Sequence, residues 1–135
     1  MKTAIRYFSR GGNTEKLARA AAQASGSPAI SVKEALHEDV DVLFLGASLY
    51  KGTVDEEVKR FIREIHVNVG RVVLFSTSAS KRSPYKKIEA LLREKGIKLA
   101  REEYYCPGSF LFFNRGRPDE KDLDAMKKFV SDIVG

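Results

Sequence analysis

Short apolar runs alternate with amphipathic stretches from one end of the chain to the other. The apolar runs are rich in β-branched and aromatic residues, and two of them, 40–45 (apart from Asp41) and 72–75, are apolar at successive positions. A strand that is apolar on both faces is typical of a parallel sheet covered by helices on both sides. We therefore predict five strands, at 4–8, 29–32, 40–45, 72–75 and 97–105.

Between the apolar runs, hydrophobic residues recur at the spacing of a helix. In the stretch 55–65, for example, Val58, Phe61, Ile62 and Ile65 stand at i, i+3, i+4 and i+7, which places them on one helical face. We predict helices over 14–24, over 55–65, from Ser83-Pro84 to a stop at Gly96, and from Pro118-Asp119 onward. The segment 33–39 has room for about one to two further helical turns.

Strands that alternate with helices indicate parallel pairing through right-handed crossovers. The charged residues of the last strand, among them Glu102 and Glu103, are typical of a strand at the edge of a sheet. The sequence contains no repeat, linker or low-complexity segment. We predict one α/β domain over residues 1–135, a three-layer α/β/α sandwich with a five-stranded parallel sheet.

The charge balance, the length of the apolar stretches and the cysteine count argue against several classes of function. Lys and Arg number 24 against 18 Asp and Glu, a net charge of +6 in 135 residues, but basic and acidic residues interleave along the predicted helices. We expect no nucleic-acid binding. No apolar stretch approaches the ~20 residues of a membrane span, and we expect a cytoplasmic protein. The single cysteine, Cys106, excludes an internal disulfide and a thiolate metal cage, and it is interpreted as a buried structural thiol without a metal site nearby.

Ligands of such sheets bind beyond the carboxyl ends of the strands, near the point where the strand order reverses. The turn after the first strand is rich in glycine, hydroxyl and amide residues and leads directly into a helix, an arrangement that favours an anion. It lacks the glycine spacing of a dinucleotide site and the G-K-[ST] of a triphosphate site, which points to a lone terminal phosphate. A plain turn with Thr14 as the helix N-cap is the alternative interpretation.

Three segments resemble the flavodoxins and the wider flavodoxin-like family. Residues 9–14 match the phosphate loop S/T-x-T/S-G-N-T at five of six positions, with Gly11 where the family usually has a hydroxyl. Residues 46–52 are similar to the flavin loop G-S-P-x-Y-x-G. Residues 116–123 are similar to the G-R-P-[DN]-E-x-D-L that opens the last helix of small bacterial members. The resemblance covers the whole chain and implies the strand order 2-1-3-4-5.

The resemblance also implies non-covalent FMN binding. Tyr50 would stack on the flavin ring, or alternatively cap the end of the sheet, and Gly52 would let the backbone approach the ring. Residues 76–79 would form a second flavin loop, or a plain strand-ending turn. Phe110, Phe112 and Phe113 would wall the flavin or plug the sheet end. The predicted cofactor-binding residues are Ser9, Arg10, Gly11, Gly12, Asn13, Thr14, Ser48, Leu49, Tyr50, Lys51, Gly52, Ser76, Thr77, Ser78 and Ala79.

The function implied is that of a flavodoxin-type FMN redox protein that transfers electrons between protein partners. In this class the flavin carries the electron chemistry, so we predict no catalytic side chain. Lys51, Lys81 and Arg82 lie in the predicted flavin loops and favour an acidic redox partner. Two alternatives stay open: an FMN oxidoreductase acting on a quinone or a tetrapyrrole, similar to protoporphyrinogen dehydrogenases, and a flavin-free binding module.

Overall fold

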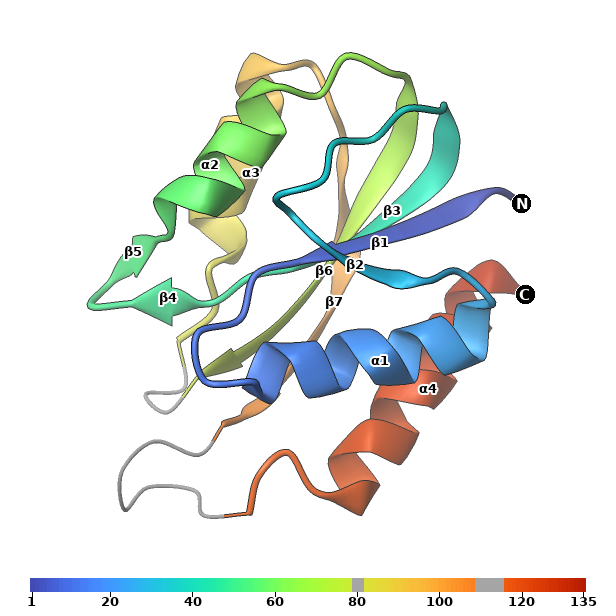
Figure 1. Ribbon diagram of the computed structural model, residues 1–135, viewed down its shortest axis with the longest axis vertical. Coiled ribbons are helices and arrows are strands. Elements are labelled where there is room, and N and C mark those ends of the chain that lie inside the picture. Colours follow the sequence, from blue (N-terminus) through green and yellow to red (C-terminus); the bar gives the residue numbers. More distant parts are fainter. Residues whose placement is uncertain (79–81, 109–115) are drawn as a thin grey trace.

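A computed structural model describes residues 1–78, 82–108 and 116–135 of the chain. Within these residues, five strands form one parallel sheet and two short strands form a separate antiparallel hairpin (Figure 1). The elements in chain order are β1 (Thr3–Tyr7), α1 (Asn13–Ser25), β2 (Ala29–Ser31), β3 (Val40–Gly46), β4 (Leu49–Tyr50), β5 (Thr53–Val54), α2 (Glu56–Arg63), β6 (Val69–Ser78), α3 (Tyr85–Glu94), β7 (Leu99–Pro107) and α4 (Glu120–Val134).

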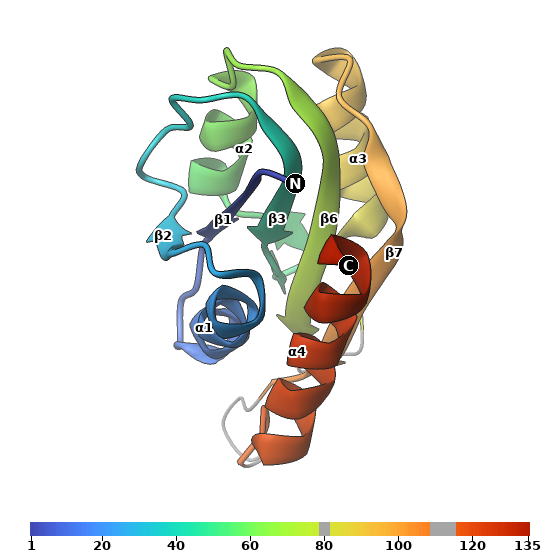
Figure 2. The same cartoon turned by 90° about the vertical axis from the view of Figure 1, so that its right-hand side faces the viewer.

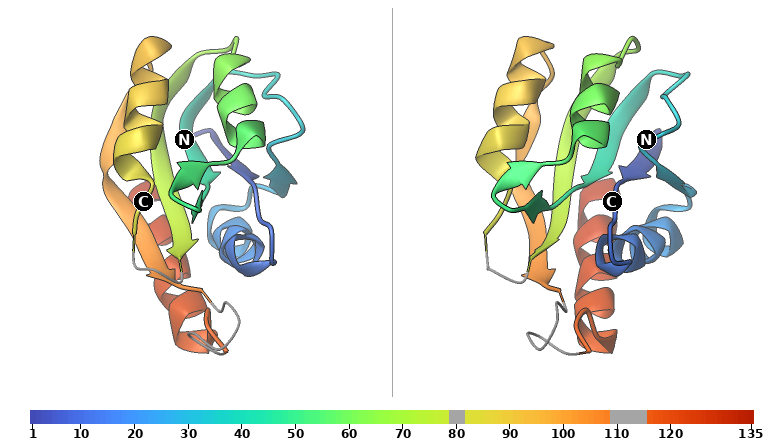
Figure 3. Two further views of the ribbon diagram at one scale, coloured as in Figure 1. Left: turned by 90° about the vertical axis from the view of Figure 1, so that its left-hand side faces the viewer. Right: turned by 60° about the vertical axis from the view of Figure 1, so that its left-hand side comes forward.

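The sheet has the order β2-β1-β3-β6-β7, which is the predicted order 2-1-3-4-5 once the hairpin strands are set aside. Helices α1 and α4 lie side by side on one face of the sheet, and α2 and α3 cover the other face (Figures 2 and 3). The predicted three-layer α/β/α sandwich is therefore confirmed. None of the helices in the described part of the chain is long and apolar enough to cross a membrane.

The core explains why the central strands are apolar at successive positions. In β3, Val42 and Phe44 pack with residues of α1 and α4, whereas Leu43 and Leu45 pack with residues of α2 and α3. All four side chains are at most 1% exposed. Since neighbouring residues of a strand point to opposite faces, each face of the sheet has its own apolar layer.

The predicted helical turns between residues 33 and 39 are wrong: apart from a turn at Lys33, this segment has bends and irregular backbone. The buried side chain of Arg6 in β1 donates to the carbonyl oxygens of Glu34 (2.9 Å) and Ala35 (3.0 Å). Helical hydrogen bonds are local, but here a guanidinium from another element satisfies the backbone. Burial lowers the pKa of Arg6, and the carbonyl oxygens supply the hydrogen bonds that a buried guanidinium requires.

Strand β6 is longer than predicted. The strand expected over 72–75 extends to Ser78, because Ser76, Thr77 and Ser78 pair with Tyr105, Cys106 and Pro107 of β7. The interpretation of these three residues as part of a loop is wrong: they are strand residues, and each is at most 8% exposed. The fourth residue of that segment, Ala79, lies outside the described residues, as do Phe110, Phe112 and Phe113.

The hairpin β4–β5 was not predicted. Leu49 pairs with Val54 and Tyr50 pairs with Thr53, so that Lys51 and Gly52 form a two-residue turn. Both have positive φ, 52° and 78°, the backbone conformation that a type I′ hairpin turn requires. Tyr50 lies in this hairpin, outside the five-stranded sheet, and is 42% exposed.

Candidate functional site at the carboxyl edge of the sheet

Three hydroxyl groups join three segments that are far apart in the sequence. The Thr14 hydroxyl lies 3.0 Å from the Ser48 hydroxyl and 3.0 Å from the Thr77 hydroxyl, and the latter two are 3.4 Å apart. The backbone N–H of Thr77 also donates to Ser48 Oγ (3.2 Å). This hydroxyl cluster connects the start of α1, the segment after β3 and the end of β6, which brings the three predicted site segments together.

The 9–14 loop turns sharply and leads directly into a helix. Helix α1 begins at Asn13, and Gly12 precedes it with a φ of 92° that glycine adopts without strain. Ser9 Oγ accepts a hydrogen bond from the Gly12 N–H (3.0 Å), which folds the loop back on itself. No described side chain caps α1 at its N-cap position, whereas Asp55 and Asp119 cap α2 and α4.

The end of β7 closes on this loop. A Cβ at Gly108 would lie 3.0 Å from the Asn13 side-chain nitrogen and 3.1 Å from Thr77 Cβ, so only glycine allows this approach without movement of its neighbours. Gly11 differs, because a Cβ there would meet nothing within 4 Å. The position where the family usually has a hydroxyl therefore has room for a side chain.

An aromatic ring and a cation face each other beside the loop. The guanidinium carbon of Arg10 lies 4.3 Å from the centroid of the Tyr50 ring, and Arg10 Nη2 donates to Asp55 Oδ2 (2.8 Å). Lys51 Nζ lies 5.7 Å from the same centroid. The 9–14 loop and the hairpin are thus linked through Arg10, and Tyr50, 42% exposed, lies next to the loop with Arg10 over one face of its ring.

Two predicted residues contribute little to this arrangement. Ser76 is 1% exposed and follows Leu74 by two positions, so it faces the α2 and α3 side, away from the hydroxyl cluster. Its hydroxyl has no hydrogen-bond partner among the residues that the structure describes. Leu49 is half-buried in β4 and packs against the apolar layer of α2 and α3.

Three residues of the site are missing from the sequence-based prediction. Asp55 holds Arg10, Gly108 packs on the loop, and Lys87 Nζ donates to the Gly52 carbonyl oxygen (2.6 Å). Asp55 carries a signal, because an Asp before two Glu residues is typical of a helix N-cap. Gly108 and Lys87 carry none, since their contacts depend on which elements the fold places side by side.

Cys106 is confirmed as a buried thiol, 3% exposed. Burial raises its pKa to about 12, with the Asp122 carboxylate as a further cause. A thiol with this pKa is not a thiolate at neutral pH and is a poor nucleophile. Cys106 therefore belongs to the core.

The 116–123 motif secures the start of α4. The Arg117 guanidinium binds both carboxylate oxygens of Asp122 (2.6 and 2.8 Å), and Asp119 and Asp122 form a reciprocal capping box. Tyr104 donates to the Asp122 carbonyl oxygen (2.9 Å). The hydrogen bonds from Arg117 lower the pKa of the Asp122 carboxyl. This motif thus has a structural role in the described residues.

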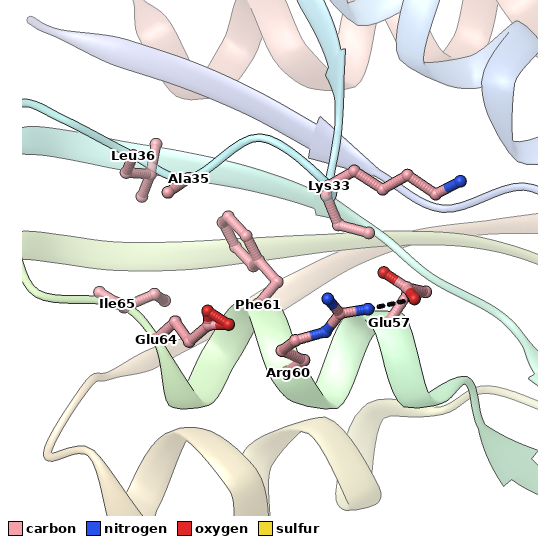
Figure 4. Close-up of a pocket in the computed structure, with 9 residues that line it drawn as sticks. Lys33, Ala35, Leu36, Glu57, Arg60, Phe61, Glu64 and Ile65 are labelled. Atoms are coloured by element: carbon pink, nitrogen blue, oxygen red, sulfur yellow. Dashed lines mark hydrogen bonds and ion pairs between the residues drawn. The ribbon is translucent and has the colours of Figure 1, made fainter.

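A separate pocket of about 100 Å³ lies between the 32–36 segment and α2 (Figure 4). Leu36, Phe61 and Ile65 supply apolar walls, and the ion pair of Arg60 with Glu57 lies at its rim. None of the described residues of the predicted cofactor site lines this pocket. The pocket is therefore separate from the 9–14 loop, the hairpin and the hydroxyl cluster at the carboxyl edge of the sheet.

The strand order reverses between β1 and β3. The 9–14 loop follows the carboxyl end of β1, and the segment with Ser48 and the hairpin follows the carboxyl end of β3. These features define a doubly wound α/β protein, a class whose ligands bind at the topological switch point. The sequence model of the Flavodoxin domain family matches residues 4–131. The chain belongs to this family, which confirms the resemblance found in the sequence motifs.

Solved structures agree on the fold. A flavodoxin from the domain Archaea superposes with a TM-score of 0.74 at 18% identity, covering 98% of this chain and 96% of that one. Oxidised flavodoxin 2 from Bacillus cereus gives 0.70 at 20% identity, with 96% and 95% covered. An NADH:FMN oxidoreductase in its apo form gives 0.66 at 13% identity, with 98% and 88% covered. No curated protein sequence matches the chain.

Proposed function

We propose that this protein binds FMN non-covalently and carries electrons between protein partners. The observation that carries the proposal is the junction of an anion-binding turn with an exposed aromatic ring. The 9–14 loop, at the start of a helix without a side-chain cap at its N-cap, lies beside Tyr50, and Arg10 links them. An anion site next to a flat apolar surface matches a ligand with a phosphate at one end and an aromatic ring at the other.

The donor set fits a phosphate. Residues 9–14 contain two hydroxyl groups, one amide and one guanidinium, and no acid. Hydrogen bonds from a helix N-terminus and from such side chains stabilise an anion without requiring its neutralisation. We infer that Ser9, Asn13 and Thr14 bind the phosphate together with the first N–H groups of α1.

The other predicted residues would orient the ring. Bound FMN would supply the electron-accepting and electron-donating chemistry. Tyr50 would stack on the flavin and shield it from water, and the turn at Lys51 and Gly52 would bring the backbone to its edge. The hydroxyl cluster would keep the two loops at a fixed separation. None of these roles requires a side chain that acts as an acid, base or nucleophile.

We infer that the redox partner is acidic. The net charge is +6, and the exposed residues Arg10, Lys51 and Lys87 surround Tyr50 or its hairpin. Opposite charges accelerate association and make it sensitive to salt. Electron transfer to an acidic partner should therefore slow as the ionic strength rises.

Titration of the apo-protein with FMN tests the proposal. Loss of ring stacking in Tyr50→Ala should weaken binding about threefold to tenfold, whereas Tyr50→Phe retains a ring and should bind nearly as the wild type does. Equal affinities of Tyr50→Ala and wild type would refute the stacking role. Absence of FMN binding to the wild type would favour a flavin-free module, and turnover of a quinone with reduced nicotinamide would favour the oxidoreductase.

A further inference from the structure

Arg10 contacts Tyr50 and Asp55 outside its own loop, and its guanidinium carbon also lies 5.9 Å from the centroid of the Phe8 ring. Its guanidinium lies on one face of the Tyr50 ring, 4.3 Å from the centroid, and donates through Nη2 to Asp55 Oδ2 at 2.8 Å. The other carboxylate oxygen of Asp55 accepts the Glu57 N–H (2.8 Å) at the start of α2. The carboxylate is therefore fixed by the helix, and it fixes Arg10 over the ring.

The guanidinium covers one of the two faces of the Tyr50 ring on which a flavin could stack. A guanidinium over an aromatic face is itself a favourable contact, so a ring that stacks on that face has to displace Arg10. Arg10 nevertheless belongs to the 9–14 loop, and a guanidinium presents five N–H donors that match phosphate oxygens well. A phosphate bound in the loop would compete with Asp55 for the same side chain.

We propose that Arg10 is a latch that makes the site select a phosphorylated flavin over riboflavin; this rests on the proposed FMN function. In the structure, Arg10 lies on the Tyr50 ring and pairs with Asp55. A phosphate in the 9–14 loop draws the guanidinium away and uncovers the ring. Riboflavin has the same ring but no phosphate, so it has to displace Arg10 without compensation.

The exposure of the pair supports such an exchange. The Arg10 side chain is 54% exposed and the Asp55 side chain 14% exposed, so the guanidinium can leave without opening the core. Its neighbour Gly11 has open space around it, and Gly12 has positive φ. An ion pair at this degree of exposure is weak enough to be broken by a doubly charged phosphate.

The experiment measures dissociation constants of apo-protein for FMN and for riboflavin by calorimetry. Arg10→Ala should weaken FMN binding about tenfold or more, because a charge-assisted hydrogen bond is lost. The same variant should bind riboflavin about two- to fivefold more tightly, because the ring is uncovered. Arg93→Ala removes an equal charge from a 74% exposed side chain paired with Glu89 on α3 and should change neither constant.

Asp55→Asn provides a second test, because asparagine is also a good N-cap and α2 keeps its start. It releases Arg10 from its anchor and should tighten riboflavin binding about two- to fivefold, the range of an exposed ion pair. Riboflavin is neutral, so general electrostatic attraction does not contribute. In the Arg10→Ala background, Asp55→Asn should have no effect, because the two residues act through one contact.

The outcomes separate the latch from the proposed function. If wild type binds FMN but Arg10→Ala leaves the ratio of the two constants unchanged, the latch is refuted and the FMN function stands. Weaker binding of both flavins to Arg10→Ala by the same factor would also refute it, since Arg10 would then support the ring. If wild type binds neither flavin, both proposals fail.

Discussion

Replacement of Thr14 by valine removes one hydroxyl from the hydroxyl cluster and keeps the shape of the side chain. Thr14 is 3% exposed, and its hydroxyl has partners at 3.0 Å in Ser48 and in Thr77. Each hydrogen bond contributes a net ~0.5–1.5 kcal/mol. The Ser48 and Thr77 hydroxyls remain in contact with each other, and Ser48 Oγ still accepts the Thr77 N–H. We therefore expect the free energy of unfolding to fall by about 1–2 kcal/mol.

Urea unfolding of the apo-protein measures this loss. The midpoint should fall with an unchanged dependence on denaturant, because the surface exposed on unfolding stays the same. Valine and threonine have similar helix propensities, so α1 itself does not account for a difference. An unfolding free energy equal to that of the wild type would refute the assignment of the cluster as a link between loops.

A double-mutant cycle tests whether Ser48 is a hydrogen-bond partner of Thr14. Thr14→Val and Ser48→Ala should be non-additive by about 0.5 kcal/mol or more, because they remove the same contact. Ser31→Ala is the matched control, since its hydroxyl accepts the Lys33 N–H (3.1 Å) and makes no contact with the cluster. Thr14→Val combined with Ser31→Ala should be additive; additivity with Ser48→Ala as well would contradict the cluster.

Three further predictions concern pH, the phosphate loop and the flavin potential. Arg117 lowers the pKa of the Asp122 carboxyl. The ionised carboxylate therefore stabilises the fold fully above the ordinary Asp pKa of about 4, and this stabilisation is lost as the pH falls through the lower pKa of the folded state. Asp122→Asn should be less stable than the wild type at neutral pH, and its urea midpoint should fall less than that of the wild type on acidification. Gly11→Thr restores the family's hydroxyl in open space and should tighten FMN binding about tenfold, as a hydrogen bond to a charged group does; unchanged affinity in a titration would contradict a phosphate at this position. Lys51→Glu should lower the potential of the second electron in a redox titration, by about 59 mV for each tenfold change in the equilibrium, because reduction adds negative charge beside Tyr50; an unchanged potential would contradict a role for the cation.

The strands and the covering layers could be predicted because their signals are local, whereas the strand order was implied by the resemblance to the flavodoxin-like family. Runs of apolar residues identify buried parallel strands, and helical periodicity identifies the covering helices; the 9–14 loop follows from residue types that favour anions. The prediction failed where a distant group intervened. Residues 33–39 are irregular rather than helical, and Arg6 of β1 binds the carbonyl oxygens of Glu34 and Ala35. No local pattern in 33–39 reports that contact.

The sequence by itself thus determined the sheet, its covering layers and the loops at its carboxyl edge. Only the tertiary structure decided how those loops meet. The pairing of β6 with β7 as far as Ser78 turns Thr77 toward Thr14 and turns Ser76 to the opposite face. The hairpin turn places Tyr50 under Arg10. Strand register and hairpin geometry fix the direction in which each side chain points. The types of the residues that come into contact do not reveal either of them.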